Sequence, residues 1–157
     1  MKYICSLIAV RDIKISRNFY ENLLNQKVEF DFGENVSFAG GFAIHLADHF
    51  QSLLGLSQNA STISYKTHNF ELYFESDDMD GIYHILKENN VEFIHEIREQ
   101  PWGQRVCRFY DPDYHIIEVG ESMERVVLRY HQTGMSVEDI SRRTSLPVGF
   151  VENVVSG

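Results

Sequence analysis

The chain has 157 residues, enough for one domain of ordinary size or for two small modules. Hydrophobic residues make up 43% and aromatic residues 13% of it, which favours a packed core and argues against a disordered chain. The formal net charge of −9 argues against nonspecific attraction to nucleic acid or to anionic membranes. Composition therefore indicates a folded protein that handles small molecules.

The two cysteines, Cys5 and Cys107, form no C-x-x-C pair, which excludes zinc-ribbon and thioredoxin-like sites. So few cysteines in a chain of this size indicate reduced thiols and a cytoplasmic location. The N-terminus passes from Met1 directly into a strand pattern without the features of a signal peptide, and no apolar run approaches the length of a membrane span. We therefore expect a cytoplasmic protein without a membrane partner.

The first half of the chain has the pattern of one strand, one helix and three further strands. Asp12 is placed to cap the helix, and the last two strands form a hairpin across Gly40 and Gly41. Residues 47–56 are compatible with a short additional helix. The strands are expected at residues 3–10, 28–32, 36–39 and 42–46.

The second half repeats this order, with Asp77 and Asp78 opening its helix. Val28-Glu29-Phe30 recurs as Val91-Glu92-Phe93 at the start of the matching strand, which indicates one supersecondary unit used twice. The strands are expected at residues 70–75, 91–97, 105–110 and 115–119. The predicted organisation is a first module at 1–57, a polar linker at 58–68 and a second module at 69–121.

Residues 122–157 depart from the repeat and are predicted to be helical. Gly134 is placed to end the first helix, Ser136 and Asp139 form a capping box for a second, and Pro147 opens a third. A helix-turn-helix that reads DNA needs a basic face, but the arginines of this appendage are balanced by acidic residues. We expect it to pack on the cup formed by the two modules or on a partner subunit, and nucleic acid is not the expected partner. In this appendage the positive charges of the four arginines are offset by four acidic residues: Arg125, Arg129, Arg142 and Arg143 stand beside Glu124, Glu138, Asp139 and Glu152.

Three motifs of the second module resemble the vicinal oxygen chelate superfamily, which includes glyoxalase I, bleomycin-resistance proteins and extradiol dioxygenases. They are Trp102-Gly103-Gln104-Arg105, Phe109-Tyr110-Asp111-Pro112-Asp113 and Ile116-Ile117-Glu118. The resemblance runs from about Tyr3 to Glu121 and departs at Tyr114, where the family commonly has glycine. It implies an α+β fold in which two βαβββ modules form a U-shaped mixed sheet.

The same resemblance implies a divalent metal held by one residue from the first and last strands of each module. Carried over by position, these residues are Cys5, His45, Glu71 and Glu118. Cysteine is also a common core residue, so Cys5 has a purely structural alternative. His45, Glu71 and Glu118 alone would suit Zn²⁺, Ni²⁺, Mn²⁺ or Fe²⁺.

Alternation within the strands supports part of this site independently. Phe70, Leu72 and Phe74 should face the helices, while Glu71, Tyr73 and Glu75 should face the other side of the sheet. The resemblance implies that Trp102 and Arg105 flank the cup, where they could contact a substrate by stacking and by a charged group. Tyr73, on the inner face, is a third candidate contact through a hydrogen bond. Each also has a structural alternative as a space-filling or solvent-facing residue.

These residues lead to three alternative functions. The first is a glyoxalase-like, metal-dependent isomerase or lyase, related to lactoylglutathione lyase, that acts on a small substrate with vicinal oxygens and uses Glu71 or Glu118 as its general base. The second is a metal-free small-molecule-binding protein of the bleomycin-resistance type. The third is a ligand sensor with a DNA-binding tail. The resemblance also implies a homodimer, in which modules are sometimes exchanged between chains.

Overall fold

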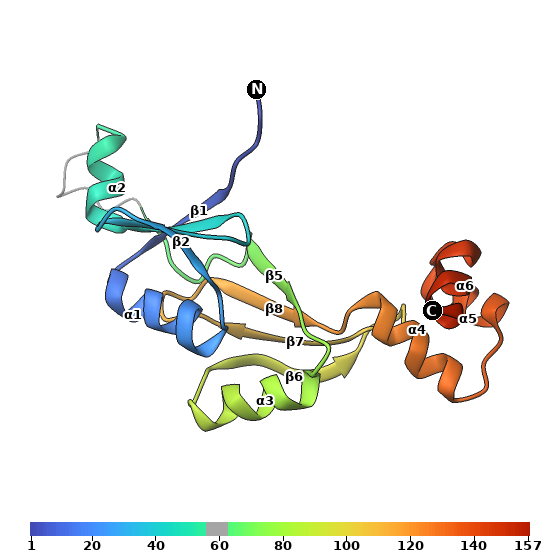
Figure 1. The fold of residues 1–157 in the computed structure, drawn as a ribbon. Coiled ribbons are helices and arrows are strands. Elements are labelled where there is room, and N and C mark those ends of the chain that lie inside the picture. The colour runs from blue at the N-terminus through green and yellow to red at the C-terminus, as the bar shows by residue number, and fades with distance from the viewer. Residues whose placement is uncertain (56–62) are drawn as a thin grey trace. The chain divides into compact units, whose positions relative to one another are not determined.

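The computed structural model describes residues 1–55 and 63–157 and has an α+β fold. Two four-stranded mixed sheets, each with the βαβββ pattern, are followed by a C-terminal helical region (Figure 1). The chain divides into two compact units: unit 1 comprises residues 1–70 and 111–115, and unit 2 comprises residues 71–110 and 116–157. The predicted fold class is confirmed. No helix of the described residues is long and apolar enough to cross a membrane.

Unit 1 contains the first sheet, with strand order β1-β4-β3-β2. β1 runs parallel to β4, and the other neighbours are antiparallel. The first helix begins at Ile13 because the Asp12 side chain accepts hydrogen bonds from the backbone N–H groups of Lys14 and Ile15. The elements are β1 (Ser6–Val10), α1 (Ile13–Asn18), the π-helical turn η1 (Phe19–Leu23), β2 (Val28–Asp31), β3 (Asn35–Phe38), β4 (Phe42–Leu46) and α2 (Ala47–Leu53).

An aromatic cluster fills the core of unit 1. The rings of Phe38 and Phe42 are stacked with centroids 4.6 Å apart, and the Tyr20 ring lies 5.1 Å from that of Phe42. Ile44 and Val10 are fully buried beside them, on the strands that form the centre and edge of the sheet. This packing holds α1 and η1 against one face of the sheet. His45 lies on the opposite face, which α1 and η1 do not cover.

The turn at residues 111–115 also belongs to unit 1, although its flanking strands belong to unit 2. Asp111 Oδ1 accepts the backbone N–H groups of Asp113 and His115, which closes the turn. Asp113 accepts hydrogen bonds from Arg11 Nε at 2.6 Å and from Ser16 Oγ at 3.2 Å. Tyr114 has a φ of 64°, in the left-handed region that favours glycine, which explains why glycine is the usual residue there.

Unit 2 contains the second sheet, with strand order β5-β8-β7-β6 and the same pairing pattern as the first. Asp78 caps α3 by accepting the backbone N–H of Gly81. The elements are β5 (Glu71–Glu75), α3 (Met79–Glu88), β6 (Phe93–Glu99), β7 (Arg105–Tyr110), β8 (Ile116–Gly120), α4 (Met123–Gln132), α5 (Val137–Thr144) and α6 (Val148–Ser156).

The two faces of the second sheet differ in polarity, as alternation predicted. Leu72, Cys107, Phe109 and Ile117 are buried on the face that α3 covers. Glu71, Tyr73 and Glu75 are exposed on the other face, which we call the open face of unit 2. Phe70 is an exception: it precedes β5 and is 45% exposed, so its expected packing on the helices is wrong.

The C-terminal helices form a small bundle with a core of its own, drawn beyond the end of the second sheet in Figure 1. Val126, Val127, Ile140 and Val151 are fully buried in it. The predicted caps are present, since Ser136 accepts the backbone N–H of Asp139 and Gly134 has a φ of 86° after α4. Of the predicted linker, residues 58–62 lie outside the described residues, and 63–68 contain neither helix nor strand.

Candidate functional site

A row of polar side chains crosses all four strands on the open face of unit 2. Strand register places Tyr73 of β5 beside Glu118 of β8, Glu118 opposite Arg108 of β7, and Arg108 opposite His95 of β6. Residues paired in register point to the same side of a sheet, so the four side chains share this face. Glu71 lies two residues before Tyr73 on the same strand and joins them there.

Arg108 lies between the two predicted catalytic carboxylates. Its Nε donates to Glu71 Oε2 at 3.0 Å, and its Nη2 forms an ion pair with Glu118 Oε2. Glu118 is only 5% exposed, and its Oε2 has no hydrogen bond of regular geometry among the described residues. A buried carboxylate is costly unless it is paired, so the Arg108 charge is what compensates Glu118.

The third nitrogen of the Arg108 guanidinium faces a histidine. Nη1 lies 3.4 Å from His95 Nε2, while His95 Nδ1 lies 2.8 Å from the backbone carbonyl of Glu96. A carbonyl only accepts, so Nδ1 carries the proton and Nε2 is left as an acceptor toward Arg108. Burial, together with the charges of Arg98 and Arg108, lowers the pKa of His95 and favours this neutral form.

His45, the predicted metal ligand of the first module, lies in unit 1 with both ring nitrogens engaged. Asn35 Nδ2 donates to His45 Nδ1 at 3.1 Å, which leaves His45 Nε2 protonated and donating to His49 Nδ1 at 2.8 Å. Burial, followed by the neighbouring His49, lowers the pKa of His45. The structure therefore explains the burial of this histidine by hydrogen bonding.

Cys5 precedes β1, so its expected place within the first strand is not observed. In the first sheet, Leu7 pairs with Ala43, two residues before His45; in the second sheet, Glu71 pairs with Ile116, two residues before Glu118. Register thus matches Glu71 with Leu7, whereas counting back from the helix caps matches it with Cys5. Leu7 has no atom that can bind a metal.

Within unit 2, the two predicted ligands Glu71 and Glu118 are paired with a protein cation and are not free for a divalent ion. The structure brings Glu71 and Glu118 together in unit 2, with a guanidinium between them, whereas His45 and Cys5 belong to unit 1. Within the described parts of the units, no three His, Cys, Asp or Glu side chains are grouped so as to hold a metal ion. The guanidinium pairs with Glu71 Oε2 and Glu118 Oε2, so a metal ion would have to compete with it for these two oxygens.

A hydrogen-bonded chain connects two of the predicted substrate contacts at the end of the open face. Trp102 Nε1 donates to Gln104 Oε1 at 3.0 Å, and Gln104 Nε2 donates to the Tyr73 hydroxyl at 2.8 Å. The Tyr73 hydroxyl in turn donates to Glu75 at 2.8 Å. Burial, then the Glu75 hydrogen bond, raises the pKa of Tyr73 to about 12, so this hydroxyl stays protonated as a donor.

Arg105, the third predicted substrate contact, is held by protein carboxylates. Its guanidinium lies 3.6 Å from Asp80 at the start of α3 and 3.6 Å from the buried Glu121. These contacts pair Arg105 of β7 with the start of α3 and with the residue that follows β8.

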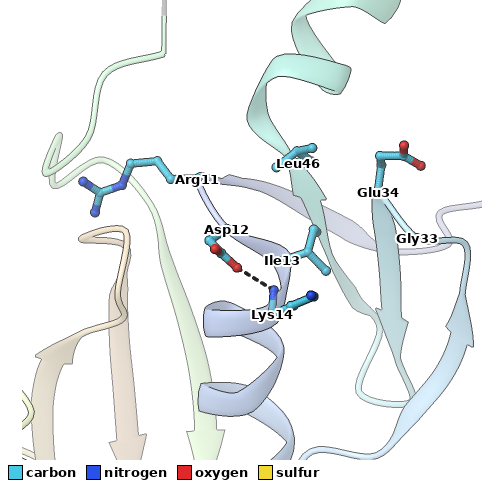
Figure 2. Close-up of a pocket in the computed structure, with 7 residues that line it drawn as sticks. All are labelled: Arg11, Asp12, Ile13, Lys14, Gly33, Glu34 and Leu46. Carbon is cyan, nitrogen blue, oxygen red and sulfur yellow. Dashed lines mark hydrogen bonds between the residues drawn. The ribbon is translucent and has the colours of Figure 1, made fainter.

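A cavity of about 420 Å³ opens in unit 1 where β1 passes into α1. Figure 2 shows Lys14 and Asp12 on the helix side and Glu34 and Leu46 on the strand side, with the Arg11 guanidinium directed away from the other side chains. Arg11 is engaged by Asp113, and no predicted site residue lines this cavity. It is therefore a hollow of mixed polar and apolar lining in unit 1 and no part of the predicted site.

Sequence reasoning missed Arg108, His95, Asn35 and Gln104. Arg108 had a signal: it is the charged residue inside the otherwise apolar run Val106–Tyr110, and the hairpin places it across from Glu118. His95 follows only from the register of β6, which contains irregularities, and Asn35 only from the pairing of β3 with β4. Gln104 stands in a quoted motif, but its buried position depends on tertiary contacts.

Comparison with known families and structures agrees with this architecture. The profile of the glyoxalase-like domain matches residues 3–124, so the match ends at the start of α4. No curated protein matches the chain. A crystal structure of a protein of unknown function from Agrobacterium tumefaciens is 41% identical, with a TM-score of 0.70 over 78% of this chain and 94% of that one.

More distant structures share the fold. A glyoxalase/bleomycin resistance protein/dioxygenase from Nocardioides is 20% identical, with a TM-score of 0.61 over 77% of this chain and 83% of that one. A lactoylglutathione lyase from Agrobacterium tumefaciens is 17% identical, with a TM-score of 0.59 over 78% of this chain and 94% of that one. At these identities the likeness concerns architecture alone.

Proposed function

Because the chain belongs to the glyoxalase-like domain family, within the vicinal oxygen chelate superfamily, we propose that it binds a small organic molecule on the open face of unit 2. The mode of binding is that of the metal-free, bleomycin-resistance type. Family membership alone does not select a reaction, since the same scaffold carries several chemistries. The proposal therefore rests on the side chains of the face.

The main support for this binding site is that Arg108 forms ion pairs with Glu71 and Glu118 in the middle of that face. The cation and the carboxylates neutralise one another in part and give the sheet a polar centre already satisfied by protein groups. Tyr73 at 46% and Trp102 at 40% exposure supply aromatic surface beside it. A partly buried polar centre with exposed aromatic groups beside it fits a small molecule that stacks and accepts hydrogen bonds.

The chain offers a direct reporter, because Trp102 is its one tryptophan and lies in the proposed site. Titration with compounds that carry vicinal oxygens, and with aromatic amines, should change the tryptophan fluorescence saturably for one of these classes in metal-free buffer. In the complex the Tyr73 hydroxyl would donate to the ligand in place of Glu75. Tyr73→Phe should therefore weaken that binding about tenfold, the value of one hydrogen bond, whereas Tyr3→Phe should leave it unchanged. Binding that is indifferent to Tyr73→Phe, or that requires added metal, would contradict the proposal.

The divalent-metal-dependent isomerase or lyase expected from the sequence is the second candidate. In its favour, Glu71 and Glu118 share the open face, and Glu118 is a buried carboxylate. Elemental analysis of tag-free protein, produced in metal-supplemented medium, separates the two candidates. Near-stoichiometric zinc, nickel, manganese or iron supports the metal-dependent enzyme, and the absence of these metals supports the metal-free binding protein. A lyase assay on vicinal-oxygen substrates, with and without added metal, then tests turnover.

We also propose a homodimer in the cytoplasm, as the family resemblance and the reduced cysteines imply. The first sheet supports a partner surface, since Phe30 at 56% and Phe32 at 69% exposure stack on each other in unit 1. Light scattering after size exclusion should give twice the chain mass of 18.3 kDa, and a monomer at micromolar concentration would refute the dimer.

A further inference from the structure

The guanidinium of Arg108 is surrounded on three sides by groups that bind divalent metals. Glu71 Oε2 lies 3.0 Å from Nε, Glu118 Oε2 contacts Nη2, and His95 Nε2 lies 3.4 Å from Nη1. Two carboxylates and one neutral imidazole are donor types that suit Zn²⁺, Ni²⁺, Mn²⁺ or Fe²⁺, but with the guanidinium between them these described side chains are not grouped closely enough to hold an ion. All three donors come from unit 2, and the first module contributes none of them.

We propose that Arg108 is a built-in cation that takes the place of a divalent metal ion among Glu71, Glu118 and His95. The inference deepens the proposed function, because it states how the polar centre of the same face works without a resident metal. It also defines a donor set different from the one that the family resemblance implies, with His95 in place of His45.

The geometry explains why a metal and Arg108 exclude each other. Guanidinium remains protonated at any pH the protein tolerates, so its charge is permanent. Like charges a few ångströms apart in a partly buried site repel strongly, and the divalent ion would have to displace Arg108 from both carboxylates. Arg108 is also the cross-strand partner of Glu118 in the centre of the sheet, and its side chain is only one-quarter exposed. The sheet itself therefore keeps the guanidinium in place.

Removal of the guanidinium should uncover the metal site. Isothermal titration of the wild-type chain with Ni²⁺ and Zn²⁺ should show no stoichiometric binding on this face, whereas Arg108→Gln should bind one ion at least about 100-fold more tightly. Arg98→Gln, a change of the same kind at an exposed arginine of β6, should behave as the wild type does. Stoichiometric metal in the wild type that is lost in Glu118→Gln would overturn the proposal.

Double variants identify the donors. Combined with Arg108→Gln, His95→Ala should abolish most of the gained affinity, whereas His45→Ala should leave it intact. A gain that depends on His45 and not on His95 would overturn the assignment, as would an Arg108→Gln chain that is folded by circular dichroism and gains no affinity. If Arg108→Gln folds only when metal is added, that rescue supports the proposal; if it folds neither with nor without these ions, the donor set is refuted.

Metal binding and small-molecule binding are measured by separate experiments. The Trp102 fluorescence titration of the metal-free wild type reports the proposed function, while calorimetry with metal ions reports the role of Arg108. Failure of the first with success of the second would refute the small-molecule site and retain the guanidinium as the site's cation.

Discussion

The hydroxyl of Tyr20 donates a hydrogen bond of 2.7 Å to Oδ2 of Asp111, deep in unit 1. Tyr20 is fully buried and Asp111 is 4% exposed, so neither group has water as an alternative partner. His115 Nδ1 contacts the same oxygen at 2.9 Å. The Asp-Pro-Asp turn, which is part of the family motif at residues 109–113, therefore has a structural role in holding η1 and the turn together.

Tyr20→Phe should lower the free energy of unfolding by about 1.5–3 kcal/mol, because it leaves a buried carboxylate oxygen with one partner fewer. Urea denaturation followed by circular dichroism measures the change. Tyr3→Phe is the matched control: its hydroxyl is exposed and contacts only Ser6, so its loss should cost less than about 0.5 kcal/mol. Equal effects of the two substitutions would show that the Asp111 contact contributes nothing specific.

Gly103 approaches α4 so closely that it has no space for a side chain. A Cβ at this position would lie 2.4 Å from the Tyr130 hydroxyl, and the backbone has a φ of 89°. We expect Gly103→Ala to lower the free energy of unfolding by about 2–4 kcal/mol, from backbone strain and from displacement of Tyr130. Gly134→Ala separates the two causes, because Gly134 has a φ of 86° with nothing within 4 Å of a Cβ and should cost only about 1 kcal/mol.

The C-terminal bundle is attached to the second sheet through the buried carboxylate of Glu121. Arg129 of α4 donates to both of its oxygens, at 3.2 and 3.0 Å, while Arg105 lies farther away at 3.6 Å. Arg129→Ala should therefore lower the free energy of unfolding by about 2–4 kcal/mol, since it leaves a buried charge poorly compensated.

The control for this substitution is Arg142→Ala in α5. Arg142 pairs with Asp139 at the surface and its side chain is 75% exposed, so its loss should cost less than about 0.5 kcal/mol. Differential scanning calorimetry should show a lower midpoint for Arg129→Ala alone. If both variants unfold as the wild type does, the bundle is held by its apolar contacts and not by this ion pair.

Much of the fold could be predicted because it depends on local pattern. Alternation placed Glu71 and Tyr73 opposite Leu72, and the caps at Asp12 and Ser136 start helices where expected. Cross-strand pairing partners could not be predicted in this way, because they depend on the register of the strands, and the register depends on turns and bulges.

The same limit applied to the site. The sequence showed Glu71 and Glu118 as carboxylates on a common face, but it did not show that Arg108 lies between them. Likewise His45 could be recognised as a candidate ligand, whereas its hydrogen bonds to Asn35 and His49 appear only when β3, β4 and α2 are assembled. Residue type was visible in the sequence, and the partner that determines its chemistry was not.

The buried His45 and the half-buried His95 should make stability fall as the pH drops through their ordinary titration range. Burial lowers the pKa of His45 and of His95 below the usual value of 6.5 in the folded chain. The unfolded chain then takes up protons more readily, so the contribution to stability is complete well above pH 6.5 and is lost as the pH falls below it. The free energy of unfolding should decrease between about pH 7.5 and about pH 5.5, a window above the titration of most carboxylates.

His45→Gln tests the origin of this decrease, because glutamine retains polar contacts with Asn35 and His49 but cannot titrate. Chemical denaturation at a series of pH values should give a shallower slope for His45→Gln than for the wild type. His131→Gln, at an exposed position of α4, should keep the wild-type slope. A slope unchanged by His45→Gln would mean that the buried imidazole of unit 1 is not the group that acid destabilises, and His95→Gln would then be the variant expected to flatten the profile.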